Sequence, residues 1–263
     1  MTEKQSFKKI LAVAQNTLNE CIRHKVLNIL FVFALALIGG SLLIEELSPG
    51  AQGRTLINVG YANMELFGFF TVMLAIFIIT FEEFEMRNLW LSLTKPISRT
   101  GYLLGKFVGL TFVLLLTLSV MSLIIMGIAF LGKIDLNFNY LLVVYAMSLG
   151  LILTIAFTLA FISIATNLTT GLIFSAFIFL IGHLTEHLQA IIENPKTPVA
   201  AKSVLALVYY LAPNFSLFNL KDKVYMNEGT FDPAYILQIT LYAALYTFLA
   251  LWLGSKAFKK KEL

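Results

Sequence analysis

A long stretch without charged side chains dominates the second half of the chain. No Asp, Glu, Lys or Arg occurs between Asp135 and Glu186. A helix needs roughly 20 apolar residues to cross a bilayer, so this stretch is too long for one span and must fold back once. The turn-forming run Asn167-Leu168-Thr169-Thr170-Gly171 is the expected point of reversal. The stretch therefore predicts two consecutive membrane-spanning helices.

The composition of the whole chain supports the same class of protein. Hydrophobic residues make up 59%, charged residues 13%, and the mean hydropathy is +0.84. Soluble domains are about 45–50% apolar and about 25% charged. The 23 Phe residues and the low charge exclude a disordered chain, and the single Cys excludes a disulfide scaffold. We expect an all-α integral membrane protein, because helices satisfy their own backbone hydrogen bonds in lipid.

Apolar runs of spanning length predict six transmembrane helices. The spans are expected at residues 26–44, 66–81, 107–131, 140–166, 172–191 and 234–254. Together they form a transmembrane domain over residues 26–254. The other parts are an N-terminal helix within 1–25, a cytoplasmic segment 82–99, an outer re-entrant segment 192–233 and a basic tail 255–263. With these limits no ionisable residue lies well inside the hydrocarbon, which disfavours an ion-coupled secondary transporter.

The distribution of basic residues predicts the orientation. Most of the 19 Lys and Arg residues fall on the side that carries both termini. The positive-inside rule therefore places both termini in the cytoplasm of a bacterial cell, with the chain in the cytoplasmic (inner) membrane. The first 25 residues are polar and basic, so we expect no cleaved signal peptide. The net charge of +4 follows from this topology and does not indicate nucleic-acid binding.

The N-terminal segment has helical periodicity. Its apolar residues recur at helical spacing, with polar residues on the other side; they are Phe7, Ile10, Leu11, Ala14, Leu18 and Ile22. This pattern predicts an amphipathic helix on the cytoplasmic membrane surface. Such a helix is either a simple interfacial anchor or a lever that contacts a cytoplasmic partner.

The segment 82–99 has the features of a docking surface. It opens with Glu82, Glu83 and Glu85, and Pro96 ends its amphipathic part. Because carboxylates favour a helix N-terminus, we expect a short cytoplasmic helix that begins at these acidic residues. A solvated loop would obey the positive-inside rule but would not explain three carboxylates on this side.

Three glycines follow this segment at intervals of four residues. Gly101, Gly105 and Gly109 share one helix face, where small residues let two backbones approach closely. The partner is either another helix of the same chain or a second chain. The run from Gly101 to Lys106 lacks the spacing and the Ser or Thr of a phosphate loop, so we expect no ATP site in this chain.

The run His183-Leu184-Thr185-Glu186-His187 matches the inverted zinc-protease pattern. On one helix, His183 and His187 would share a face and could bind a metal, but no third ligand is evident. We favour a polar span end and assign no metal site. An intramembrane metalloenzyme that uses His183, Glu186 and His187 is the weaker alternative.

Two segments carry a family resemblance. Lys95-Pro96-Ile97-Ser98-Arg99, followed by Tyr102-Leu103-Leu104-Gly105-Lys106-Phe107, resembles the type-2 ATP-binding-cassette (ABC) export permeases. It looks most like the branch containing the permease of the nitrous-oxide-reductase copper-maturation transporter. Residues 213–220 (Pro-Asn-Phe-Ser-Leu-Phe-Asn-Leu) look like that branch too. The resemblance implies that two permease chains pair and that two separate ATPase subunits dock beneath them.

The resemblance also implies roles for particular residues. The probable ATPase contacts on the coupling helix are Glu82, Glu83, Glu85, Arg87 and Trp90, and the coupling-loop motif comprises Lys95, Pro96, Ser98 and Arg99. The chain itself would be no enzyme and hold no cofactor, because ATP and Mg would bind the partner ATPase.

The substrate stays open. The lone Cys21 and the scattered Met residues give no reason to infer copper transport. Membrane lipid surrounds such a permease, and a periplasmic partner protein is compatible with it. The alternative is a non-transport anchor or signalling subunit of an envelope complex that contains an ATPase.

Overall fold

The regular elements of this chain are helical throughout the part that can be described. The computed structural model describes residues 3–47, 52–85, 98–131, 138–194, 197–221 and 231–260. The expected all-α class is confirmed. In chain order the elements are α1 (Glu3–Arg23), the 3-10 turn η1 (Val26–Asn28), α2 (Ile29–Leu47), α3 (Gln52–Glu85), α5 (Arg99–Leu131), α6 (Asn139–Ile164), α7 (Leu168–His183), α8 (Thr185–Glu193), α9 (Val199–Leu211), the 3-10 turn η2 (Phe215–Phe218) and α11 (Pro233–Lys260).

Four of these helices are long and apolar enough to cross a membrane. They contain the stretches Ile57–Phe81, Arg99–Leu131, Asn139–Ile164 and Pro233–Lys259. Two bent pairs would each add one span: Lys8–Arg23 with Val26–Gly40, bent by 53°, and Leu168–His183 with Thr185–Glu193, bent by 57°. The described residues therefore provide four to six spans, and the predicted number of six corresponds to counting each bent pair as one.

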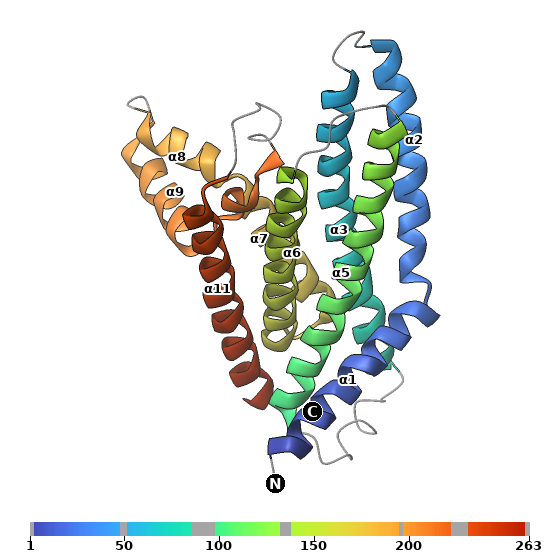
Figure 1. Cartoon of the computed structure of the whole chain (residues 1–263). Coiled ribbons are helices and arrows are strands. Elements are labelled where there is room, and N and C mark those ends of the chain that lie inside the picture. The colour runs from blue at the N-terminus through green and yellow to red at the C-terminus, as the bar shows by residue number, and fades with distance from the viewer. Residues whose placement is uncertain are drawn as a thin grey trace.

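The long helices run up and down between two ends of the molecule (Figure 1). Both termini lie at one end, which we call the terminal end; α3 finishes there and α5 begins there. The helices α8 and α9 and the turn η2 lie towards the opposite end, which we call the distal end. The described residues at the two ends of the predicted segment 82–99, namely 82–85 and 98–99, thus lie at the terminal end.

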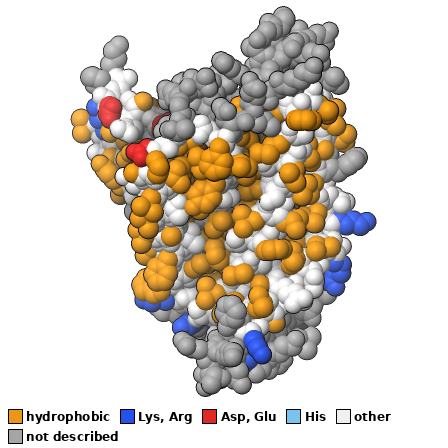
Figure 2. All heavy atoms as spheres, viewed as in Figure 1, with side chains coloured by type: hydrophobic (Ala, Val, Ile, Leu, Met, Phe, Trp, Pro, Cys, Tyr) orange, Lys and Arg blue, Asp and Glu red, His pale blue; other side chains and the backbone are white. Residues whose placement is uncertain are grey.

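Large apolar side chains cover the middle of the bundle. Figure 2 shows a broad hydrophobic band on the visible face, with most of the visible Lys and Arg side chains towards the terminal end. Large apolar side chains that are exposed on the long helices include Phe112, Leu123, Phe177, Leu245 and Phe248. Such a belt suits hydrocarbon as a solvent and is far larger than the apolar patches of soluble monomers.

Helix α3 corrects two predictions from the sequence. It runs unbroken from Gln52 to Glu85, so Glu82, Glu83 and Glu85 form its last turn rather than the first turn of a separate helix. The apolar run marks the depth of the lipid, whereas the helix continues through polar residues because no proline interrupts it. The side chains of these glutamates, and residues 86–97 with Arg87, Trp90, Lys95 and Pro96, lie outside the described part.

The second correction concerns charge within the spans. The span in α3 begins at Ile57 and therefore contains Glu65, which the predicted limits of 66–81 had excluded. The argument against an ion-coupled transporter, which relied on spans free of ionisable groups, no longer applies.

Candidate functional site

At the terminal end, helix α1 packs closely against two glycines of α5. A Cβ atom on Gly105 would lie 2.6 Å from Val13 Cβ and 2.9 Å from the carbonyl oxygen of Ile10. On Gly109 it would lie 2.7 Å from the carbonyl oxygen of Ala14. Two of the three predicted glycines therefore bring two backbones of the same chain together. The internal alternative for Gly105 and Gly109 is the correct one.

The face of α1 that packs on α5 is narrower than the predicted apolar face. Ala14, Thr17 and Cys21 are buried, whereas Leu11 and Ile22 are exposed by 55% and 52%. Small side chains lie at the interface because the glycines of α5 leave room only for a close approach. The large apolar side chains point away from it, where lipid would solvate them. The N-terminal helix is thus a packed part of the bundle as well as an amphipathic one.

The predicted coupling-loop motif ends in two residues that tie helices together. Ser98 is the N-cap of α5, because its Oγ accepts a hydrogen bond of 3.1 Å from the Gly101 N–H. Arg99 reaches the far end of the chain: its Nη1 donates to the carbonyl oxygens of Phe258 at 3.0 Å and Lys259 at 3.2 Å.

These carbonyls belong to the last described turn of α11. A cation at a helix C-terminus also interacts favourably with the helix dipole. Stacking of Tyr102 on Phe258, with ring centroids 6.3 Å apart, adds a second contact between α5 and α11. The first turn of α5 is therefore joined to α11, and the next two turns, through Gly105 and Gly109, to α1.

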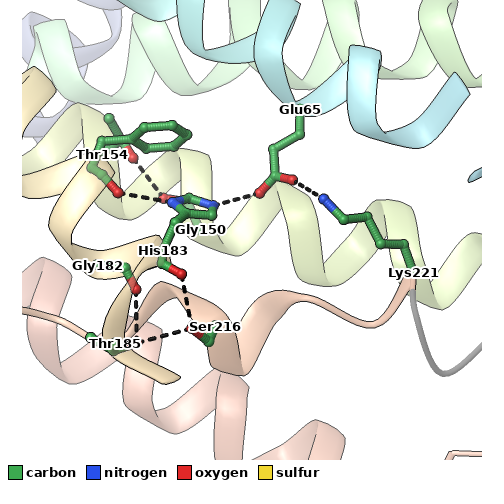
Figure 3. A network of polar contacts seen from close by, with 9 residues as sticks. Glu65, Gly150, Thr154, Gly182, His183, Thr185, Ser216 and Lys221 are labelled. Atoms are coloured by element: carbon green, nitrogen blue, oxygen red, sulfur yellow. Dashed lines mark hydrogen bonds and ion pairs between the residues drawn. The ribbon is translucent and has the colours of Figure 1, made fainter. Parts of the chain in front are cut away.

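At the distal end, three ionisable side chains meet within the bundle. Glu65 of α3 lies between His183 of α7 and Lys221 (Figure 3). Its Oε1 is 2.7 Å from His183 Nε2, and its Oε2 accepts a hydrogen bond of 2.8 Å from Lys221 Nζ. The three side chains are mostly buried, with 19%, 28% and 21% exposure for Glu65, His183 and Lys221.

The imidazole of His183 has contacts through both ring nitrogens and one ring face. Its Nδ1 lies 2.9 Å from the carbonyl oxygen of Phe179. Because both ring nitrogens face acceptor oxygens, the ring donates to both only as the cation. The ring also stacks on Phe215, with centroids 5.4 Å apart and planes 11° from parallel. The histidine therefore presents a fixed donor to Glu65.

The turn η2 inserts two phenylalanines beside this network. Phe215 and Phe218 are buried, and both lie against glycines that leave space for their rings. A Cβ on Gly182 would meet Phe215 and come within 2.7 Å of the Pro213 carbonyl oxygen, and one on Gly150 would lie 3.2 Å from Phe218. The segment 213–220, which the family resemblance had indicated, thus places two buried aromatic side chains against α6 and α7.

Neutral hydrogen bonds attach the same segment to α8 and α11. The buried hydroxyl of Thr185 lies 2.6 Å from Asn214 Oδ1 and 2.9 Å from Ser216 Oγ. The hydroxyl of Tyr242 accepts a bond of 2.8 Å from the Asn214 backbone N–H. Tyr235 donates to the Leu217 carbonyl oxygen at 2.7 Å. Residues 213–220 therefore pack as one body with α7, α8 and α11.

The structure separates the two histidines of the predicted metal motif. Helix α7 ends at His183 and α8 begins at Thr185 with a bend of 57°, so His183 and His187 do not share a continuous helix face. His183 bonds Glu65, whereas His187 is exposed. Among the described residues no group of three or more His, Cys, Asp or Glu is arranged to hold a metal ion.

Sequence reasoning missed Glu65 and the pairing of Lys221. Glu65 precedes the most apolar part of its helix. The span predicted from that apolar run therefore began at residue 66, one position after Glu65. Its partners His183 and Lys221 lie 118 and 156 residues away, and no local pattern connects such positions. One local signal was available: a single carboxylate stands next to an apolar run, close enough to lie inside the same span. An ionisable residue within a span is by default a candidate functional residue.

Comparison with known proteins agrees with this architecture. A family model described as ABC-2 family transporter protein matches residues 46–256, about four fifths of the chain. A search of curated proteins finds no match. The matched region begins near the end of α2 and reaches into the last turns of α11. It includes α5 and the three residues of the distal network, whereas the residues of α1 and Phe258 and Lys259 that contact α5 lie outside it.

Proposed function

The chain belongs to the ABC-2 transporter family as a membrane permease subunit of an ABC transporter, and from this premise we propose that it couples ATP hydrolysis by separate ATPase subunits to export. In this proposal two permease chains pair and two ATPase subunits bind ATP and Mg beneath them. The terminal end faces the cytoplasm of a bacterial cell, as the basic residues favour. The chain supplies no catalytic group; it supplies the helices that move.

The observation that carries the proposal is the way the terminal end is joined. The residues between α3 and α5 connect directly to Ser98 and Arg99, which fix α5 and the last turn of α11. Gly105 and Gly109 fix α5 to the backbone of α1. A force applied between α3 and α5 would therefore reach α1, α5 and α11 together. Such a junction is what an ATPase needs in order to drive the whole bundle.

The family to which the chain belongs does not identify its substrate. The Lys95–Arg99 segment supports a place in the branch that includes the permease of the nitrous-oxide-reductase copper-maturation transporter. This does not extend to copper itself, which prefers clustered thiolate and thioether ligands. Cys21, the single cysteine, is buried between α1 and the bundle. The export proposal therefore names no metal cargo.

Affinity purification from native membranes in mild detergent tests the proposal. We expect a separate ABC ATPase to co-purify in equal amount. Reversal of charge at Glu82, Glu83 and Glu85 together should reduce that co-purification while membrane insertion stays intact, because three carboxylates end α3 beside the connecting segment. The matched control is reversal at Glu186 and Glu193, which are exposed on α8 at the distal end.

Each outcome has a clear meaning. Recovery of the chain alone in several detergents would contradict the proposal. Equal ATPase recovery with the triple variant and the control would contradict the docking role of the glutamates. ATPase binding without any substrate flux in reconstituted vesicles would favour the non-transport subunit instead.

A further inference from the structure

The distal ion-paired residues connect two bodies of the bundle. On one side, residues 213–220 are bound to α7, α8 and α11 through Thr185, Tyr235 and Tyr242. On the other side stands α3, which carries Glu65. His183 and Lys221 belong to the first body and both bond Glu65, so their bonds cross the boundary. The three side chains therefore join α3 directly to the α7–η2–α11 body, in addition to the packing of both on α6.

The environment makes this connection strong. Glu65 is mostly buried and lies within Ile57–Phe81, a stretch of α3 that is long and apolar enough to cross a membrane. A charged group inside a span needs a partner, because hydrocarbon offers it neither water nor hydrogen bonds. When Glu65 keeps both partners, each of the three side chains has a hydrogen-bond partner in the other body. When it loses them, three ionisable groups lie unpaired at once, unless water enters.

The remaining contact described between α3 and α7 near this point is apolar. Phe69 stacks on Phe179 with ring centroids 4.2 Å apart. Lipid chains solvate such rings nearly as well as protein does, so apolar contacts between helices in a membrane separate at little cost. The directional part of the contact therefore lies with Glu65, His183 and Lys221.

We propose that Glu65, His183 and Lys221 form a latch that closes the distal end of the permease, and that export requires its release. This inference rests on the proposed function, in which the distal end faces the periplasm and must open for substrate to leave. Release separates α3 from the α7–η2–α11 body and lets water reach the charges. The three residues are positioning residues: they hold helices together and do not contact ATP, which binds the partner ATPase in the proposed function.

A distance measurement across the boundary tests the latch without knowledge of the substrate. Spin labels are placed at Ala62→Cys on α3 and Ala190→Cys on α8, two exposed positions, in a chain with Cys21→Ala. Double electron–electron resonance then reports the distance distribution in lipid nanodiscs. We expect one short distance without ATP, and a longer one when the partner ATPase and ATP are present.

The decisive variant is Glu65→Gln, measured without the ATPase. It keeps the size of the side chain and removes its charge. We expect the ratio of long to short distances to rise about tenfold or more, because hydrogen bonds to charged groups are among the strongest in proteins. Lys221→Gln leaves the His183 contact and should give a smaller rise. The exchange Glu65→Lys with Lys221→Glu restores one ion pair but not the His183 bond, so it should bring back part of the short-distance population, which a general loss of stability would not do.

Two further outcomes keep the latch separate from its premise. The matched control Glu186→Gln removes an exposed carboxylate of α8 and should leave the distribution unchanged. If Glu65→Gln and Lys221→Gln both give the wild-type distribution, or if the control shifts it equally, the latch is wrong. If only the response to ATP is missing, because no ATPase binds the wild type, the proposed function fails while the test of the latch in the isolated permease still stands.

Discussion

The two ends of this bundle are held together by different kinds of contact. At the terminal end, the contacts involve backbone atoms: Gly105 and Gly109 let the backbone of α1 approach, and the Arg99 side chain binds two carbonyls of α11. At the distal end, α3 is joined to its neighbours by contacts between side chains, through the Glu65 ion pairs and the stacking of Phe69 on Phe179. Backbone contacts at van der Waals limits have little freedom to slide, whereas ion pairs can break and re-form. We therefore expect the terminal end to transmit force as a unit and the distal end to move.

The largest effect should come from filling the glycine interface. The double variant Gly105→Ala with Gly109→Ala places two methyl groups within 3 Å of the α1 backbone. Overpacking of this kind costs about 3 kcal/mol, and backbone atoms cannot rotate away as side chains do. Helix α1 should then move off α5. Because Cys21 is buried on α1, a thiol-reactive dye should label it well below the midpoint of global thermal unfolding.

A glycine on the same helix provides the control. A Cβ on Gly127 would meet nothing within 4 Å, so Gly127→Ala should be neutral or slightly stabilising. Its gain would be about 0.5–1 kcal/mol, because alanine loses less conformational freedom in a helix. If the double variant and Gly127→Ala label at the same temperature, the close approach of α1 and α5 does not determine the stability of this end.

A medium effect is expected for Thr185→Val at the distal end. Valine keeps the shape but removes the hydroxyl that lies near Asn214 and Ser216. A buried acceptor left without its donor costs about 1–3 kcal/mol. Unlike the glycine variant, this one should lower the global midpoint without early labelling of Cys21. The control is Thr169→Val, at an exposed position of α7, which should change neither the midpoint of unfolding nor the temperature at which Cys21 is labelled. Early labelling of Cys21 with Thr185→Val would show that the two ends do not behave independently.

The two ends also differ in how far the sequence predicted them. The glycine stripe was readable, because a spacing of four residues fixes a helix face whatever the partner is. The partner itself was left open between another helix of the same chain and a second chain, since periodicity carries no information about which backbone fills the groove. Helices of spanning length were readable for a similar reason, because apolar length predicts them; the described residues provide four to six spans against the six predicted.

The distal end was not predicted, because its contacts join residues far apart in the sequence. Glu65 was excluded by a span limit drawn one residue too late, and Lys221 was placed in the outer loop with no partner assigned. The motif His183-Leu184-Thr185-Glu186-His187 was misleading for a local reason. Its spacing assumes one continuous helix, and the bend after His183 removes that assumption. The resemblance found residues 213–220 but gave no role for them; the structure shows that their phenylalanines are buried beside α6 and α7.

The smallest effect on stability, and a larger one on coupling, is expected for Arg99→Gln. The loss of two hydrogen bonds to the α11 carbonyls, in a partly exposed setting, should cost about 1 kcal/mol. The last turn of α11 should fray, which hydrogen exchange of residues 255–260 would measure. If the junction transmits force, substrate-dependent stimulation of the partner ATPase should fall by more than the stability does. Lys259→Gln is the matched control, because it removes a positive charge from the same turn and keeps the backbone acceptor. Equal fraying in the two variants would mean that charge near the helix terminus, and not the bonds of Arg99, holds α11 to α5.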